Sequence, residues 1–302
     1  MSTIRPMAFA ALVLAALLST ACDGPSKTAP TSTGGGIFSA APGDEIRFPT
    51  RLAIGPGDTI YVSDVEADRV YAYRDGVRTL ELNGLAGPLG LAIAGNRLYV
   101  GCSGRHAVEV YDIASRTYVA TLATDFLLPN AIAVASDGTV VVADSRAGTV
   151  RAFSSTGDEQ SAISGLRFPS AVAVTDSNTF VGEQGTSRIL VYDRSGKRVR
   201  ELGGEIPVDV GQRNGFEGRF SRIQGLAVAD GRLYVLDAYH GHVQVLDPET
   251  GAFHAILGRL GGCPTCLGLA LDVAVGSDGH VWVADPDHRR WLAVDAAAEV
   301  AR

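Results

Sequence analysis

Of the five histidines in the last third of the sequence, three are candidates for one site together with acidic and aromatic neighbours. His240 and His242 are separated by one glycine, and His288 occurs further along, directly after Asp287. Imidazole nitrogens are common ligands of zinc and other divalent ions, so one interpretation of this group is a metal site. The alternative is that each histidine only hydrogen-bonds the backbone of its own loop. The sequence leaves both interpretations open.

Other polar and aromatic side chains accompany these histidines, many of them in two long segments, residues 203–222 and 258–270. Tyrosine and arginine are residue types that often dominate binding to protein partners. The candidate binding residues are Asp209, Arg213, Asn214, Arg219, Arg222, Tyr239, His240, His242, Asp287 and His288. No catalytic residue is assigned.

The cysteines add a possible covalent link to this region. Cys263 and Cys266 form a Cys-Pro-Thr-Cys stretch, which is compatible with a disulfide, a redox pair or half of a metal site. No histidine follows Cys266, so the stretch does not support covalent haem attachment. An exported chain favours the disulfide. Cys102 stands alone, and we expect it to be a buried free thiol.

The elements that must position these residues come from a pattern that recurs six times, with a period of roughly forty to fifty residues. One copy reads Pro129-Asn-Ala-Ile-Ala-Val134, then the turn Ser136-Asp-Gly138, then Val140-Val-Val-Ala-Asp144. The residue that closes this second run is called the anchor. The six anchors are Asp64, Cys102, Asp144, Glu183, Asp237 and Asp285. Six positions after each anchor stands an apolar residue: Val70, Val108, Val150, Ile189, Val243 or Trp291.

Short apolar runs bounded by Asp-Gly and Gly-Asn turns predict β-strands joined by hairpins. Each copy supplies about four of them, which is the content of one propeller blade. The copies resemble the NHL repeat, in which Pro-x-Gly-Ile-Ala-Val precedes Ile-Tyr-Val-Ala-Asp and a polar loop ending in Arg-Ile. The resemblance covers residues 49–294 and implies an all-β, six-bladed β-propeller of four-stranded antiparallel blades.

The ends of a propeller must meet, because an open ring leaves raw sheet edges. The last copy lacks a clear fourth strand, so we expect residues 37–40 near the N-terminus to complete the last blade. We also expect the loop after each anchor and the crossover into each blade to open on one face. Both oversized crossovers, 203–222 and 258–270, would then project from that face. Because nearly every blade has an anchor carboxylate, we expect these groups to be structural.

The first residues resemble a bacterial lipoprotein signal. Arg5 precedes the apolar run Met7–Leu18, which is too short to span a bilayer, and small residues lead to Cys22. Lipoboxes usually have an aliphatic residue where this chain has Ser19, so ordinary cleavage with release is the alternative. The expected organisation is a signal peptide at 1–21, a lipidated Cys22 at the start of a flexible tether at 22–36, and the propeller at 37–302.

The formal net charge of −7 gives no electrostatic basis for binding nucleic acid or anionic lipids. We therefore expect a monomeric binding scaffold in the cell envelope, attached to the membrane by lipid alone, that binds a protein, peptide or glycan. The alternative is a metal-dependent lyase or hydrolase similar to the peptidyl-hydroxyglycine amidating lyases. Those enzymes use zinc held by histidines with a tyrosine and an arginine nearby. The matching residue types here, without a matching spacing, are His240, His242, His288, Tyr239 and Arg213. Zinc or calcium is the expected ion for that alternative.

Overall fold

The computed structural model describes residues 37–39, 46–204 and 217–294, which belong to one compact unit extending from Gly35 to Arg302. The predicted signal peptide, Cys22 and the tether lie outside the described residues. Asp209, Arg213 and Asn214 lie outside them as well. Within the described residues, no helix is long and apolar enough to cross a membrane.

The described residues form six antiparallel sheets, each built from one sequence copy. Each sheet is one blade, and the blades are numbered one to six in chain order. The first sheet contains β2 (Pro49–Gly55), β3 (Thr59–Asp64), β4 (Arg69–Arg74) and β5 (Val77–Asn83), and the second contains β6 (Pro88–Ala94), β7 (Arg97–Cys102), β8 (Ala107–Asp112) and β9 (Thr117–Ala123). The third contains β10 (Pro129–Val134), β11 (Val140–Asp144), β12 (Thr149–Phe153) and β13 (Glu159–Ile163). The fourth contains β14 (Pro169–Val174), β15 (Asn178–Glu183), β16 (Arg188–Asp193) and β17 (Arg198–Gly203).

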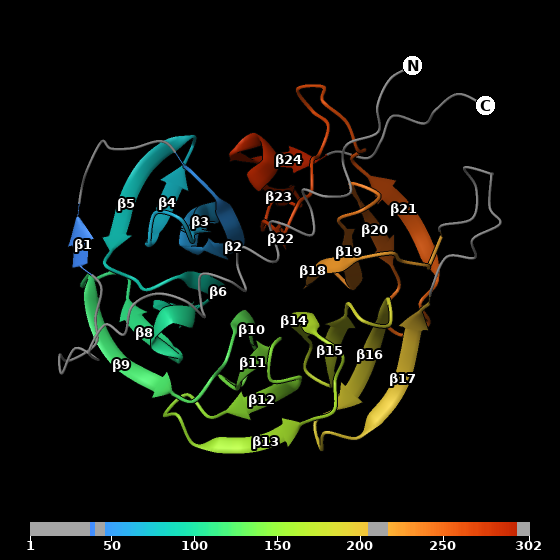
Figure 1. Cartoon of the computed structure of the whole chain (residues 1–302), viewed down its shortest axis with the longest axis horizontal. Helices are drawn as coiled ribbons and strands as arrows, with labels where there is room; N and C mark the ends of the chain where they lie inside the picture. Colours follow the sequence, from blue (N-terminus) through green and yellow to red (C-terminus); the bar gives the residue numbers. More distant parts are fainter. Residues whose placement is uncertain (1–36, 40–45, 205–216, 295–302) are drawn as a thin grey trace. The chain divides into compact units, whose positions relative to one another are not determined.

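The fifth sheet comprises β18 (Ile223–Ala229), β19 (Arg232–Asp237), β20 (His242–Leu246) and β21 (Phe253–Leu257). The sixth comprises β22 (Asp272–Val275), β23 (Val281–Asp285) and β24 (Arg290–Val294). Short 3-10 turns occur at η1 (Pro56–Asp58), η2 (Ser103–Arg105) and η3 (Pro286–His288). The first strands of successive sheets contact one another in order, and β22 contacts β2, so the sheets form a closed ring (Figure 1). The predicted six-bladed propeller is confirmed.

The hydrophobic core lies between adjacent blades rather than within any one of them. Alternating side chains of a strand point to opposite faces of its sheet, and both faces are covered by neighbouring blades. Apolar residues of blades one and two form one cluster, and equivalent clusters fill the other five interfaces. Val62, Val142 and Val235 in the second strands are fully buried. Each blade therefore depends on both neighbours for its stability.

The ring closes differently from the sequence-based prediction. Strand β1 (Ile37–Ser39) pairs with β5 at the outer edge of blade one, with Ile37 opposite Asn83. The prediction that this segment completes the last blade is therefore wrong. Among the described residues, blade six has three strands. The reason lies in hydrogen-bonding edges: the outer edge of β5 offers backbone groups to a further strand, and pairing with β1 satisfies them.

Side chains of blades one and six join the two ends of the ring. The Asp272 carboxylate accepts a hydrogen bond from Leu52 N at 2.9 Å. Asp58 accepts from both the backbone N and the hydroxyl of Ser277, at 2.8 and 2.7 Å. The ring of Tyr73 lies 4.2 Å from that of Trp291, centroid to centroid. These contacts hold the ends together without a strand shared between them.

The anchor carboxylates join two loops in each blade that has one. Asp144 is representative: Oδ1 accepts from Leu128 N and Ala147 N, and Oδ2 accepts from Leu127 N. Leu127 and Leu128 belong to the crossover entering the blade, whereas Ala147 lies in the loop that follows the anchor. Equivalent bonds to the entering crossover are made by Asp64, Glu183, Asp237 and Asp285. The expected structural role of the anchors is supported, and both kinds of loop lie on the same face.

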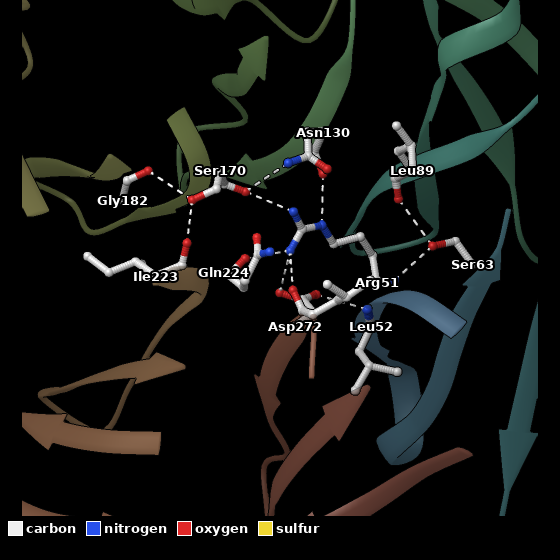
Figure 2. Close-up of polar contacts among 11 residues, drawn as sticks. Arg51, Leu52, Ser63, Leu89, Asn130, Ser170, Gly182, Ile223, Gln224 and Asp272 are labelled. Carbon is white, nitrogen blue, oxygen red and sulfur yellow. Dashed lines mark hydrogen bonds and ion pairs between the residues drawn. The ribbon is translucent and has the colours of Figure 1, made fainter. Parts of the chain in front are cut away.

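The side chain of Arg51 in β2 lies at the axis of the propeller and is buried, with 3% exposure. Its guanidinium hydrogen-bonds four backbone carbonyls from the other side of the ring at 2.6–2.8 Å, those of Asn130, Ser170, Gln224 and Leu271 (Figure 2). An ion pair with Asp272 at 3.3 Å completes its surroundings. Burial raises the pKa of Asp272, and the attraction of Arg51 opposes this rise.

Candidate functional site

The candidate residues that the structure describes belong to blades five and six. They lie on the face that carries the loops after the anchors. Arg219 and Arg222 lie at the end of the crossover into blade five. Tyr239 and His240 come from the loop between β19 and β20, and His242 is the first residue of β20. Asp287 and His288 come from the equivalent loop of blade six, within η3. The two loops have equivalent register because each follows its anchor directly.

In blade five, the anchor and both histidines converge. His240 Nδ1 donates to Asp237 Oδ2 at 2.8 Å, and the His240 and His242 rings stack with centroids 5.4 Å apart. One ligand atom from each of Asp237, His240 and His242 lies within 4.8 Å of the others. His242 is 8% exposed, and its Nε2 has no hydrogen-bond partner. This group has the composition of a three-ligand metal site.

Burial and neighbouring charge set the ionisation of this group. Burial lowers the pKa of His242 to about 4, against the attraction of Asp237, so the imidazole is neutral at physiological pH. Burial alone would raise the pKa of Asp237. Hydrogen bonds from His240 and from the backbone of Ser221 and Arg222 outweigh burial and hold this pKa below its ordinary value. A buried carboxylate therefore faces a buried neutral imidazole.

Arg222 and Tyr239 form a second contact, between the crossover into blade five and the loop that follows its anchor. Arg222 Nη1 donates to the Tyr239 hydroxyl at 2.8 Å, and the guanidinium carbon lies 5.0 Å from the centroid of the tyrosine ring. The Tyr239 residue is 48% exposed although its ring is held from one side. A fixed, exposed aromatic ring loses little conformational entropy when a partner covers it.

Blade six lacks the second histidine, and its histidine contacts the anchor of its own blade. His288 Nδ1 lies 2.6 Å from Asp285 Oδ2, and Arg290 Nε reaches the same oxygen at 3.3 Å. Asp287 accepts from Leu269 N at 2.9 Å, which holds the entering crossover. The structure groups His240 and His242 with the anchor of blade five, whereas His288 contacts the anchor of blade six.

The crossover into blade six folds back over the loop of blade five. Leu260 forms a bridge with Leu267, and a disulfide joins Cys263 to Cys266 between them. A Cβ placed on Gly241 would lie 2.7 Å from the Leu260 Cα, so the two loops are in close contact. Leu260 is 53% exposed and stands beside the loop that carries Tyr239. Sequence reasoning missed Leu260, which is one of three leucines in a glycine-rich insertion.

A polar cavity is lined by residues from both ends of the crossover into blade five. The cavity has a volume of about 800 Å³, and Gly203, Gly204 and Arg219 form part of its lining. Further arginines line it at Arg167, Arg188 and Arg198, together with Glu183 and Glu201. Glu201 pairs with Arg188 and Arg198. The predicted binding residue Arg219 therefore borders a cavity with more cationic than anionic groups.

Comparison with known proteins agrees with this architecture. The family model of the NHL repeat matches residues 220–246, which span the end of the blade-five crossover through β20. The chain is a six-bladed β-propeller that contains an NHL repeat. No curated protein is significantly similar in sequence.

Several solved structures share the fold at low identity. A gluconolactonase from Xanthomonas campestris is 18% identical with a TM-score of 0.62, over 88% of this chain and 96% of that one. Hydrazine synthase from Kuenenia stuttgartiensis is 16% identical with a TM-score of 0.62, over 86% and 99%. Virginiamycin B lyase from Staphylococcus aureus is 12% identical with a TM-score of 0.56, over 80% and 79%. Their different activities show that the fold alone does not assign one.

Proposed function

We propose that this chain is an exported, lipid-anchored propeller that binds a protein or peptide of the cell envelope through blades five and six. The observation that carries the proposal concerns Tyr239 and Leu260, because Leu260 lies against Gly241, two residues after Tyr239. Both are large, exposed side chains, and they reach the same face from two neighbouring loops. An aromatic and an aliphatic residue beside cationic groups are typical of the centre of a protein interface.

The base under these two side chains is rigid. The Asp237 carboxylate holds the backbone of Ser221 and Arg222 at 2.7 and 3.1 Å, and Arg222 holds Tyr239. Under Leu260, Arg290 donates to the carbonyls of the disulfide loop. A surface ordered before binding loses less entropy on association, which favours affinity.

The envelope location rests on the N-terminal sequence. The apolar run Met7–Leu18, the small residues that lead to Cys22 and the polar tether support an exported chain held near a membrane by lipid. Mass spectrometry of the mature N-terminus tests this part of the proposal. Acyl groups on Cys22 are the expected result, and an unmodified mature chain would make the protein a free secreted one.

The binding surface is tested with a photo-crosslinking residue in place of Tyr239, alone and combined with Leu260→Ser. Val77→Ser and Val119→Ser make a matched control, because these residues are exposed hydrophobics on other parts of the propeller, 65% and 42% exposed. A photo-crosslinking residue in place of Tyr239 should capture a discrete envelope protein. The Leu260→Ser change should reduce that capture at least tenfold, whereas the control changes should leave it intact. Equal capture by all of these proteins would remove the proposed surface.

A metal-dependent lyase or hydrolase has weaker support. Of its three candidate histidines, only His240 and His242 come together. The axial position, where side chains from the first strands meet, is filled by Arg51 and its hydrogen bonds. We therefore favour binding over catalysis for this face.

A further inference from the structure

The residue five positions after the anchor is of a different type in blade five than in blades one, four and six. Blades one, four and six carry an arginine there, namely Arg69, Arg188 and Arg290. In blade six this arginine contacts the anchor carboxylate, with Nε 3.3 Å from Asp285. Blade five carries His242 instead. The anchor of blade five therefore has an imidazole nearby where the anchor of blade six has a guanidinium.

One ring nitrogen of the imidazole that replaces the arginine has no hydrogen-bond partner. His242 Nε2 is buried and makes no hydrogen bond, which is costly for a ring nitrogen in the interior. The carboxylate oxygen of Asp237 and a nitrogen of His240 lie within 4.8 Å of the ligand atom of His242. Two imidazoles and one carboxylate thus lie together in blade five, whereas blade six has one imidazole, one carboxylate and the guanidinium of Arg290.

We propose that Asp237, His240 and His242 bind one divalent transition-metal ion of the zinc, cobalt and nickel class. Two nitrogen donors and one carboxylate suit these ions. Calcium is a poor fit because it takes six to eight oxygen ligands. His240 is 23% exposed on its side chain, so the ion can enter from solvent and keep a water as its fourth ligand. The site lies next to the partner surface proposed above, and its test does not depend on a partner.

Small movements suffice to form the coordinated state. His240 Nδ1 exchanges its hydrogen bond with Asp237 for the ion. The backbone N–H groups of Ser221 and Arg222 continue to hold the carboxylate, as outer-shell partners do in metal sites. Three protein ligands and one water make an open site, which binds less tightly than a closed four-ligand structural site.

The test is titration of the full mature chain, purified without a histidine tag, with Co²⁺ and Zn²⁺. Visible absorption of bound Co²⁺ and calorimetry with Zn²⁺ are the measurements. His242→Arg restores the residue type of blades one, four and six, and His240→Ala restores that of Ala67 and Ala147 in blades one and three. Both are natural at these positions and should fold. The matched control is His288→Ala, which removes the equivalent histidine of blade six.

The expected result is one ion per chain, with affinity reduced at least a hundredfold in His242→Arg and His240→Ala and unchanged in His288→Ala. Absence of binding by the unsubstituted chain would overturn the proposal. So would full affinity in both blade-five variants, or an equal loss in the control. Circular dichroism and urea unfolding of each variant separate a lost ligand from a lost fold.

Discussion

Arg51 and Asp272 form a buried ion pair, 3.3 Å from Nη1 to Oδ1, that connects the first strand of blade one to the first strand of blade six. The same guanidinium bonds carbonyls of blades three, four, five and six (Figure 2). One side chain therefore joins blade one to four other blades at the axis.

Replacing Arg51 with methionine should be among the most damaging single changes in the chain. It leaves four backbone carbonyls and the Asp272 carboxylate buried with fewer donors. Removing one partner of a buried ion pair typically costs about 3–5 kcal/mol. Urea unfolding gives the free energy of unfolding. Arg97→Met, which removes an exposed pair with Asp112, is the control and should change it little. Equal effects would mean that the axial contacts contribute no more than a surface pair.

The hydrogen bonds of the anchor carboxylate predict that two substitutions of Asp144 lower the free energy of unfolding by different amounts. Asp144→Ala removes the acceptor for three backbone N–H groups and should lower the free energy of unfolding by about 2–3 kcal/mol. Asp144→Asn keeps one acceptor oxygen and should cost about half as much. Urea unfolding measures both, and hydrogen exchange at Leu127 should rise first in the alanine variant. An asparagine variant as unstable as the alanine one would contradict the hydrogen-bond explanation.

The sequence predicted the repeats, the strands and the role of the anchors because these depend on local patterns that recur. The axial pair was missed although it left a signal. At the strand position paired with the residue before the anchor, three blades carry Ala131, Ala171 or Gly225, whereas blades one and six carry Arg51 and Asp272. Small residues leave room at the axis, and two opposite charges fill it.

The candidate site was predictable only in part. The shared register of His240 and His288 correctly predicted equivalent positions, and both contact their anchors. The grouping of His240 and His242 with Asp237 was not predictable, because it depends on the side-chain positions in the folded loop. The pairing of β1 with β5 was likewise hidden, since a three-residue strand carries too little pattern to choose between two sheet edges.

The contact between Tyr73 and Trp291 predicts a pH dependence at the blade one and six interface. Burial raises the pKa of Tyr73 to about 12, opposed by Arg78, whereas the unfolded chain titrates near 10. The folded state thus keeps a proton that the unfolded state loses, and stability falls as the pH rises from 10 towards 12. Relative to Tyr73→Phe, the unsubstituted chain should lose about 1–2 kcal/mol over this range, since partial exposure reduces the full shift. Urea unfolding of both proteins at several pH values measures it, and a constant difference from pH 8 to 12 would contradict the prediction.

Gly241 links the stability of the fold to the proposed binding surface. Its φ is +59°, in the left-handed region, and a Cβ there would meet the backbone of Leu260 at 2.7 Å. Gly95 has nearly the same φ, +56°, but a Cβ added to it would meet no atom within 4 Å. Gly95 is therefore a matched control for the effect of backbone conformation alone.

Gly241→Ala should do more than impose backbone strain. Gly95→Ala should cost about 1 kcal/mol, the usual penalty for an L-residue at such a φ. Gly241→Ala should cost about 1–2 kcal/mol more, because the crossover carrying Leu260 must move away. If Tyr239 and Leu260 act together, partner capture should fall in the Gly241 variant and stay intact in the Gly95 variant. Urea unfolding and crosslinking from position 239 measure the two effects on the same proteins. Equal losses of stability would show that the two loops do not press on each other, and the adjacency of Leu260 to the tyrosine loop would then have no energetic consequence.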